Sequence, residues 1–179
     1  MPRLGTLDLV PATSRPDLLG DPVRRALAAW PHAGEVLLAE IDPALADTAA
    51  MSEAYAVPLE ASANCVVVMG RRAGDERTAA CLVRADTRAD VNTTVKKLLD
   101  VRKCSFLDHD RAVAETGMEH GGITPVGLPS EWPVLVDDAV VDQPWVVVGS
   151  GTRGSKLLLP GARLAELASA HVMLLRQVG

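Results

Sequence analysis

A dense run of glycine and proline residues is the first feature of the sequence that could do chemistry. The segment 117–129 reads Gly-Met-Glu-His-Gly-Gly-Ile-Thr-Pro-Val-Gly-Leu-Pro. Neither a helix nor a central strand tolerates this composition, so it predicts a rigid loop whose backbone can approach a ligand closely. Successive N–H groups of such a loop can converge on an anion or on an oxyanion. The same composition also fits an ordinary turn between a helix and a strand.

Other catalytic arrangements find little support. A metal site needs three or four ligands at usable spacing, but His32, His109, His120 and His171 are isolated from one another and from the cysteines. A nucleophilic serine usually sits at a tight exposed turn, and Ser150, between two glycines, lacks the strand–elbow–helix context of such a turn. No Gly-x-x-x-x-Gly-Lys-Ser/Thr segment is present to form a P-loop. We therefore expect neither a metal nor another cofactor.

The order of residues in the glycine loop resembles the signature of a known family. Gly-Gly-Ile-Thr-Pro-Val-Gly follows a predicted helix that ends in Glu-Thr-Gly. This loop, the upstream Val-Lys-Lys-Leu-Leu of residues 95–99 and the downstream Val-Val-Val-Gly-Ser-Gly of residues 146–151 are similar to the YbaK/prolyl-tRNA-synthetase-associated family. Its members are small aminoacyl-tRNA deacylases that occur alone or inserted in a synthetase. The resemblance covers the chain from about Asp47 to the C-terminus.

The resemblance implies which residues form a site. In the family, the glycine loop holds an activated ester while a water and a hydroxyl of the tRNA itself carry out hydrolysis, so that proximity and oxyanion stabilisation supply the rate. Carried over residue by residue, the catalytic loop is Gly121, Gly122, Ile123, Thr124 and Pro125. The residues expected to contact substrate are Asn64, Val66, Val68, His120, Gly149, Ser150, Gly151 and Lys156.

One of these positions departs from the family pattern. The family usually carries a lysine on the strand before the first hairpin, where this chain has Asn64. An amide can form hydrogen bonds but supplies no charge, which puts either activity or substrate choice in question. Lys156 or an arginine of the hairpin could compensate. His120 either orients a water or is a solvated turn residue.

Composition limits the partners. The chain has 179 residues, is 48% hydrophobic and 23% charged, and contains only 3% aromatic residues. Few aromatic residues and a net charge of −5 argue against DNA and against a long RNA footprint, so a tRNA partner would be gripped mainly at its acceptor end. Widely spaced cysteines, no signal pattern and no apolar run long enough for a bilayer predict a cytoplasmic protein away from membranes.

The elements that must position the loop read as short strands and short helices. We expect residues 1–20 to form an extended N-terminal arm, helices at 22–30, 43–55, 91–100 and 108–115, and a hairpin of strands 63–69 and 78–84 with an arginine-rich turn. That basic fringe is either a solvated edge or a contact for RNA phosphate. About seven or eight strands that do not alternate cleanly with helices predict one α+β domain, 1–179. The family resemblance also implies its mixed, partly closed β-barrel of the YbaK type.

Three functional hypotheses follow. The first is a stand-alone trans-editing hydrolase that deacylates mischarged aminoacyl-tRNA carrying a small amino acid, with an aminoacyl-tRNA synthetase as a further partner. The second is a non-catalytic module of the same fold that binds the tRNA end, a nucleotide or a synthetase, which the missing lysine favours. The third is a general esterase that uses Ser150. A hydrophobic wall discriminates small side chains only modestly, so the amino acid stays open.

Overall fold

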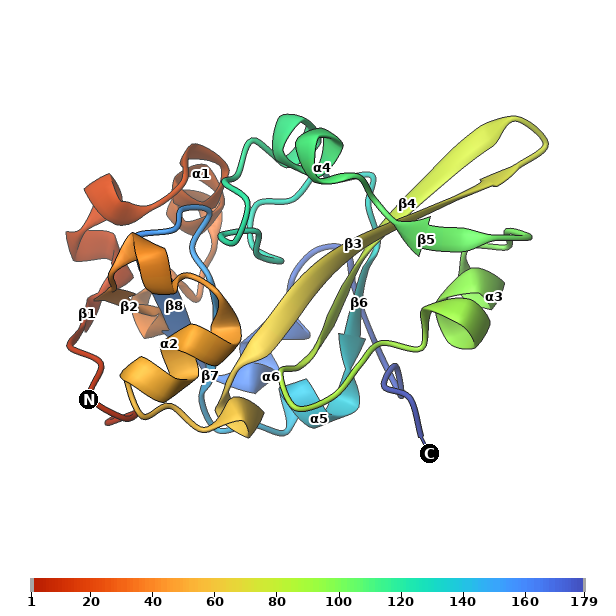
Figure 1. Ribbon diagram of the computed structural model, residues 1–179. Coiled ribbons are helices and arrows are strands. Elements are labelled where there is room, and N and C mark those ends of the chain that lie inside the picture. The colour runs from red at the N-terminus through yellow and green to blue at the C-terminus, as the bar shows by residue number, and fades with distance from the viewer. Residues whose placement is uncertain (1, 179) are drawn as a thin grey trace.

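Residues 2–178 form nine strands arranged in two sheets in the computed structural model (Figure 1). Met1 and Gly179, the ends of the predicted domain 1–179, lie outside the described residues. The first sheet has the order β1-β2-β8-β7, and all its pairs are antiparallel. Its strands are β1 Leu9–Pro11, β2 Leu37–Glu40, β8 Ser155–Leu159 and β7 Val146–Gly149.

The second sheet is mixed and has the order β5-β3-β4-β6-β9. Its strands are β5 Cys104–Phe106, β3 Ala63–Arg72, β4 Asp75–Arg84, β6 Val134–Asp137 and β9 Ala170–Met173. β3 and β4 form a long antiparallel hairpin that projects beyond the rest of the molecule at the upper right of Figure 1. The hairpin turns at Ala73 and Gly74, which both have positive φ, as a tight two-residue turn requires.

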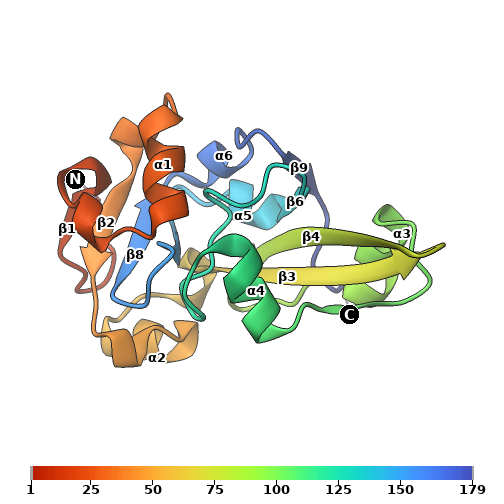
Figure 2. The ribbon, with the colours of Figure 1, turned by 90° about the horizontal axis from the view of Figure 1, so that it is seen from above.

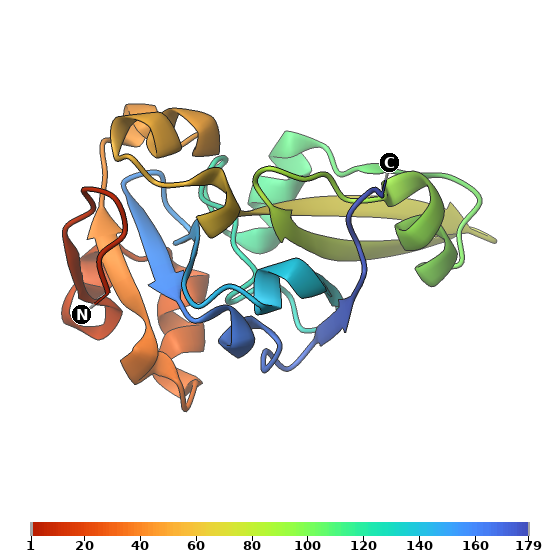
Figure 3. The same ribbon diagram turned by 90° about the horizontal axis from the view of Figure 1, so that it is seen from below.

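Short helices cover both sheets. They are α1 Asp21–Ala29, α2 Thr48–Ala54, α3 Lys96–Leu98, α4 His109–Thr116, α5 Asp138–Val141 and α6 Gly161–Leu164. Seen from above in Figure 2, α4 lies over β3, and from below in Figure 3, α3 lies against the outer part of the hairpin. No helix of residues 2–178 is long and apolar enough to cross a membrane.

Because alternate side chains of a strand point to opposite faces of the sheet, the central strand β4 contributes to two separate hydrophobic cores. On β4, Ala80 and Leu82 pack into a core that lies between the two sheets and includes residues of α1, α5 and α6. The intervening Cys81 and Val83 pack on the opposite face, with residues around α3. Successive side chains of a strand point to opposite faces, so a central strand buried on both sides must be apolar throughout.

The capping residues Asp108 and Gly117 determine where α4 begins and ends. Asp108 accepts hydrogen bonds from the backbone N–H groups of Asp110 and Arg111, which have no partner inside the first turn of the helix. Gly117 ends the helix in the left-handed region, at φ 67°. The glycine loop therefore starts at a fixed point and in a fixed direction.

The α+β class is confirmed, whereas the partly closed barrel is not. In the described part of the chain the two sheets are separate, and a single isolated bridge, between Ser62 and Val147, joins them. The predicted arm of residues 1–20 is more regular than expected in its described part, because β1 pairs with β2 and two 3-10 turns follow it. The predicted helix 43–55 is divided into a 3-10 turn and α2, because Asp47 caps a new helix.

Candidate functional site

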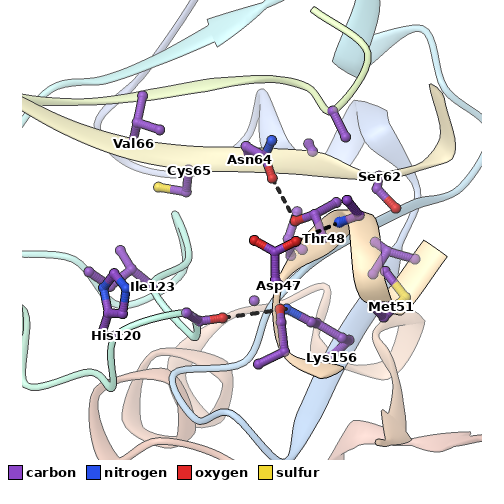
Figure 4. A pocket seen from close by; sticks show the side chains of 18 of the residues that line it. Asp47, Thr48, Met51, Ser62, Asn64, Cys65, Val66, His120, Ile123 and Lys156 are labelled. Atoms are coloured by element: carbon purple, nitrogen blue, oxygen red, sulfur yellow. Dashed lines mark hydrogen bonds between the residues drawn. The ribbon is translucent and has the colours of Figure 1, made fainter. Parts of the chain in front are cut away.

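A pocket of about 640 Å³ opens between the two sheets, where α2, β3, β7, β8 and the loop after α4 meet (Figure 4). Pockets of roughly 300–1,000 Å³ hold ligands of drug size, and the volume of this pocket lies within that range. Seven of the predicted site residues lie in its wall, namely Asn64, Val66, His120, Gly121, Ile123, Gly149 and Lys156.

Two glycine-rich loops form one side of the pocket by packing backbone against backbone. The N–H of Gly151 donates to the carbonyl of Gly122 over 2.8 Å. A Cβ atom added at Gly122 would lie 2.5 Å from the carbonyl oxygen of Thr152, and one added at Gly149 would lie 2.5 Å from that of Gly122. Neither contact is possible for a residue with a side chain. Glycine is thus required at Gly122 and Gly149 for the loops to meet at all.

Arg153 and Glu119 hold the same two loops together through charged side chains. The guanidinium of Arg153 donates to the carbonyl of His120 over 3.1 Å and to the carbonyl of Pro43 over 2.9 Å. In return, the carboxylate of Glu119 accepts from the backbone N–H of Arg153 at 2.6 Å. Hydrogen bonds that involve a charged partner are the stronger kind, so the loop is fixed before a ligand arrives.

Lys156 brings a buried cation to the pocket wall. It extends from β8, is only 5% exposed, and its Nζ donates to the carbonyl of Ala46 at 2.7 Å and to that of Gly121 at 3.4 Å. Burial lowers the pKa of this ammonium to about 8, an effect that Asp47 opposes and Arg153 reinforces. The group can therefore carry a proton or lack one near neutral pH, and it can polarise an ester carbonyl when charged.

The N-terminus of α2 supplies a polar edge opposite the glycine loops. The hydroxyl of Thr48 donates to the carboxamide oxygen of Asn64 over 2.7 Å, which fixes the side chain of Asn64 at the pocket edge. Asp47 caps α2 and also lines the pocket. Asp47 and Thr48 were not among the predicted site residues, because the sequence pattern placed the start of this helix at Asp42-Pro43. The Asp-Thr pair before a run of alanines is a second cap signal that could have located them.

The other predicted site residues lie behind the pocket wall. They are Val68, Gly122, Thr124, Pro125, Ser150 and Gly151. Val68 is fully buried in the core beside α3, because it faces away from the first sheet. Thr124 is also fully buried, and its hydroxyl makes no hydrogen bond within residues 2–178. These residues can support the wall but do not line it.

Ser150 has a structural position. Its side chain is fully buried, and its hydroxyl donates to the carbonyl of Ser155 at 2.9 Å and accepts from the hydroxyl of Ser155 at 2.7 Å. A nucleophile needs an exposed hydroxyl next to a base. The esterase hypothesis therefore loses the residue on which it depends.

Cys65 and a pair of imidazoles also face the pocket, and only His120 of the three was predicted. Burial raises the pKa of the Cys65 thiol far above its usual range, so the thiol stays protonated and is a poor nucleophile. The rings of His109 and His120 lie with their centroids 4.3 Å apart at the pocket edge. Within residues 2–178, no group of three or more His, Cys, Asp or Glu side chains is placed to hold a metal.

The arginines of the β3–β4 hairpin are engaged in ion pairs within the protein. Arg71 pairs with Glu76 at 3.2 Å, and Arg77 pairs with Asp100 at 3.3 Å. Arg72 also pairs with Asp100. The positive charge of the predicted basic fringe is thus partly neutralised, and the pocket itself contains none of these arginines.

A family model and two solved structures are similar to this chain. The model described as an aminoacyl-tRNA editing domain matches residues 42–167. A protein proposed to be a trans-editing enzyme for prolyl-tRNA synthetase is 20% identical, with a TM-score of 0.73 over 89% of this chain and 99% of that one. A hypothetical protein is 21% identical, with a TM-score of 0.75 over 88% of this chain and all of the other. At these identities the two structures show the fold alone. Because the family model matches well over half of the sequence, the chain belongs to the aminoacyl-tRNA editing domain family.

Proposed function

We propose that this protein is a trans-editing deacylase that hydrolyses mischarged aminoacyl-tRNA carrying a small amino acid. The observation that carries the proposal is the position of the pocket in the family match. Every residue of the pocket wall falls between Ala46 and Lys156, inside the matched segment 42–167. The family relationship and the 640 Å³ pocket thus concern the same part of the chain, and the acceptor end of a tRNA is the ligand that this family implies.

The proposed reaction needs no nucleophile from the protein. A water adds to the ester carbonyl carbon, the bond to the ribose oxygen breaks, and that oxygen takes up a proton to leave free tRNA and an amino acid. Lys156 supports the negative charge that develops on the carbonyl oxygen, since it lies in the wall with its ammonium near Gly121. A hydroxyl of the terminal ribose assists the water. Ser150 and Cys65 take no covalent part, the first because it is buried and hydrogen-bonded and the second because its thiol stays protonated.

Preference for a small amino acid rests on the apolar part of the wall. Ile123 and Cys65 line the pocket at the left of Figure 4, and Met51 lies at its far end. The side chain of Val66 points to the other face of β3, where it packs against the core beside α3. Val68, which the sequence suggested for this wall, is not available because it is buried in the core beside α3. One methylene in such a wall changes discrimination by about 1–3 kcal/mol, so a preference for one small residue over another is modest.

A second candidate function is favoured by one observation. Asn64 occupies the position where the family usually has a lysine, and its oxygen is already bonded to Thr48. A protein with this substitution could bind the acceptor end without turning it over. Its partner would be the tRNA end, a nucleotide or a synthetase.

A panel of mischarged tRNAs tests the proposal against this alternative. The purified protein is incubated with tRNAs charged with alanine, serine, threonine or a large amino acid, and with the free aminoacyl esters. The proposal expects first-order release of one small amino acid from tRNA and slow release from the esters. Saturable binding of the same tRNAs without hydrolysis of any of them supports the non-catalytic module and overturns the deacylase. Equal rates on tRNA and on free esters argue against a tRNA-directed enzyme.

A further inference from the structure

The pocket contains a single carboxylate. Among the residues of its wall, Asp47 is the only Asp or Glu, and Lys156 is the only Lys or Arg. The two charges come from different elements, one from the start of α2 and the other from β8. A ligand that fits both must itself carry a positive and a negative or electron-rich end.

One of the two carboxylate oxygens of Asp47 forms hydrogen bonds with the backbone of α2, the helix that Asp47 caps. Oδ1 accepts from the backbone N–H of Ala49 at 3.0 Å and from that of Ala50 at 3.5 Å. Oδ2 makes no hydrogen bond and no ion pair with any of residues 2–178. The side chain is exposed, and Figure 4 shows this oxygen pointing into the pocket, on the side where Ile123 and His120 lie.

Lys156 does not neutralise this oxygen. Its ammonium donates to the carbonyls of Ala46 and Gly121, and no ion pair with Asp47 forms within 4.0 Å. Even so, the two groups interact, because the negative charge of Asp47 raises the pKa of Lys156. The pocket thus carries a negative charge from the start of α2 beside a positive charge from β8.

We propose that Asp47 Oδ2 binds the α-ammonium group of the aminoacyl ester, so that the pocket selects acyl groups with a free α-amine. The inference rests on the proposed function and names the part of the substrate that the site recognises. An aminoacyl ester has the matching polarity, because its ammonium lies on the carbon next to the ester carbonyl. With the ammonium at Asp47, the carbonyl oxygen is free to face Lys156. Esters of α-hydroxy acids and N-acylated amino acids lack this cation.

The variant Asp47→Asn removes the negative charge of this side chain but keeps its hydrogen bonds to the N-terminus of α2. Asparagine caps helices about as well as aspartate, so α2 keeps its N-terminal hydrogen bonds. A hydrogen bond between charged partners is about twice as strong as a neutral one, and solvent exposure of Asp47 weakens it. Loss of the charge should therefore weaken binding of the ammonium group by about tenfold.

Asp42→Asn is the matched control. Asp42 caps the 3-10 turn that precedes α2 by accepting from the N–H of Ala44 at 2.9 Å, and it is also exposed. It does not line the pocket. The two variants make the same chemical change at neighbouring caps, and only one of them faces the ligand.

The test measures binding and not turnover, so that it does not depend on hydrolysis. The probes are two amide-linked analogues of the tRNA end, 3′-alanylamino-3′-deoxyadenosine and its lactyl counterpart, which differ only in an α-amine or an α-hydroxyl. We expect the wild-type protein and Asp42→Asn to prefer the alanyl analogue by about tenfold. In Asp47→Asn this preference should disappear through weaker binding of the alanyl analogue alone. Equal losses for both analogues, an unchanged preference, or binding of neither analogue by the wild type would overturn the assignment.

The outcome is separable from that of the proposed function. If the alanyl preference depends on Asp47 while no mischarged tRNA is hydrolysed, the ammonium site stands and the deacylase fails. If mischarged tRNA is hydrolysed while the preference is absent, the deacylase stands and the role of Asp47 fails.

Discussion

The hydroxyl of Thr48 and the carboxamide oxygen of Asn64 are joined by a 2.7 Å hydrogen bond that links α2 to β3 at the edge of the pocket. The amide nitrogen of Asn64 makes no hydrogen bond within residues 2–178. At the position where the sequence resemblance led us to expect a lysine, this protein therefore offers a neutral donor.

Asn64 variants test whether this donor meets the tRNA. Asn64→Ala should lower turnover by about tenfold, the effect of one hydrogen bond of about 1.4 kcal/mol. Asn64→Lys should tighten tRNA binding and steepen its dependence on salt, because one more cation meets phosphate. Deacylation rates and tRNA affinities at two salt concentrations measure both effects.

Asn92→Lys is the control for added charge, because Asn92 is exposed and does not line the pocket. An equal change of salt slope in Asn92→Lys and Asn64→Lys would attribute the effect to net charge. Unchanged kinetics and salt slope in both Asn64 variants would leave Asn64 as a structural residue of the strand.

Gly122→Ala should separate the two glycine loops. The added methyl group would lie 2.5 Å from the carbonyl oxygen of Thr152, so the backbone must shift. A displacement of about 1 Å near a reacting group can cost a hundredfold in rate, and we expect at least that loss in kcat/KM. Gly34→Ala is the control, since nothing lies within 4 Å of the added atom. Full activity in a folded Gly122→Ala protein would remove the loop from the site.

Lys156 predicts a distinctive dependence of stability on pH. Its pKa is about 8 in the folded protein and 10.5 in the unfolded chain. Between these values the unfolded chain binds more protons at this residue, so the free energy of unfolding rises with pH, by up to about 1.4 kcal/mol per pH unit. Below pH 8 both states are protonated and this slope vanishes.

The contribution of Lys156 can be isolated by denaturant unfolding of the wild type and of Lys156→Met at pH 7, 8, 9 and 10. All other titratable groups are common to both proteins. The wild type should gain stability relative to Lys156→Met above pH 8. A constant difference across the four pH values would mean that the ammonium is not desolvated.

Ser150→Ala should affect stability and not catalysis. It removes a buried hydroxyl that bonds with the carbonyl and the hydroxyl of Ser155, and it leaves both of these groups with one partner fewer. We expect a loss of about 1–3 kcal/mol in the free energy of unfolding and a turnover within a few-fold of the wild type at temperatures where both are folded. Ser130→Ala, at an exposed serine, should change neither. A loss of more than about a thousandfold in turnover would indicate covalent catalysis.

Local signals predicted most of the elements. The β3–β4 hairpin follows from two apolar runs around Ala73-Gly74, and α4 follows from Asp108 at its start and Gly117 at its end. These features depend on residues close in the chain. The barrel was not predictable in the same way, because sheet closure depends on strand pairs that are distant in sequence. Within residues 2–178, the bridge between Ser62 and Val147 is the only β-bridge that connects the two sheets.

The parts of the candidate site that lie on a loop with a recognisable sequence pattern were predictable. The parts whose position depends on tertiary packing were not. Gly121 and Ile123 of the predicted loop line the pocket, whereas Gly122, Thr124 and Pro125 lie behind its wall. Lys156 also lines it, although the sequence offered it only as one of several cations that could compensate for Asn64. Asp47 was missed because its part in the pocket depends on the break between two short helices. Val68 was assigned to the wrong side, because strand alternation gives two faces but does not say which one meets the pocket.

The backbone contact between Gly122 and Gly151 has a consequence for how such a site can evolve. The contact is made by backbone atoms only, so replacing side chains cannot change it gradually. Any side chain at Gly122 or Gly149 would clash and break it. The opposite wall is built from side chains of α2 and β3, and each of these can change independently. Under the proposed function, a lineage would acquire a new acyl preference through residues such as Asp47, Met51 and Asn64, while the glycine side stays as it was inherited.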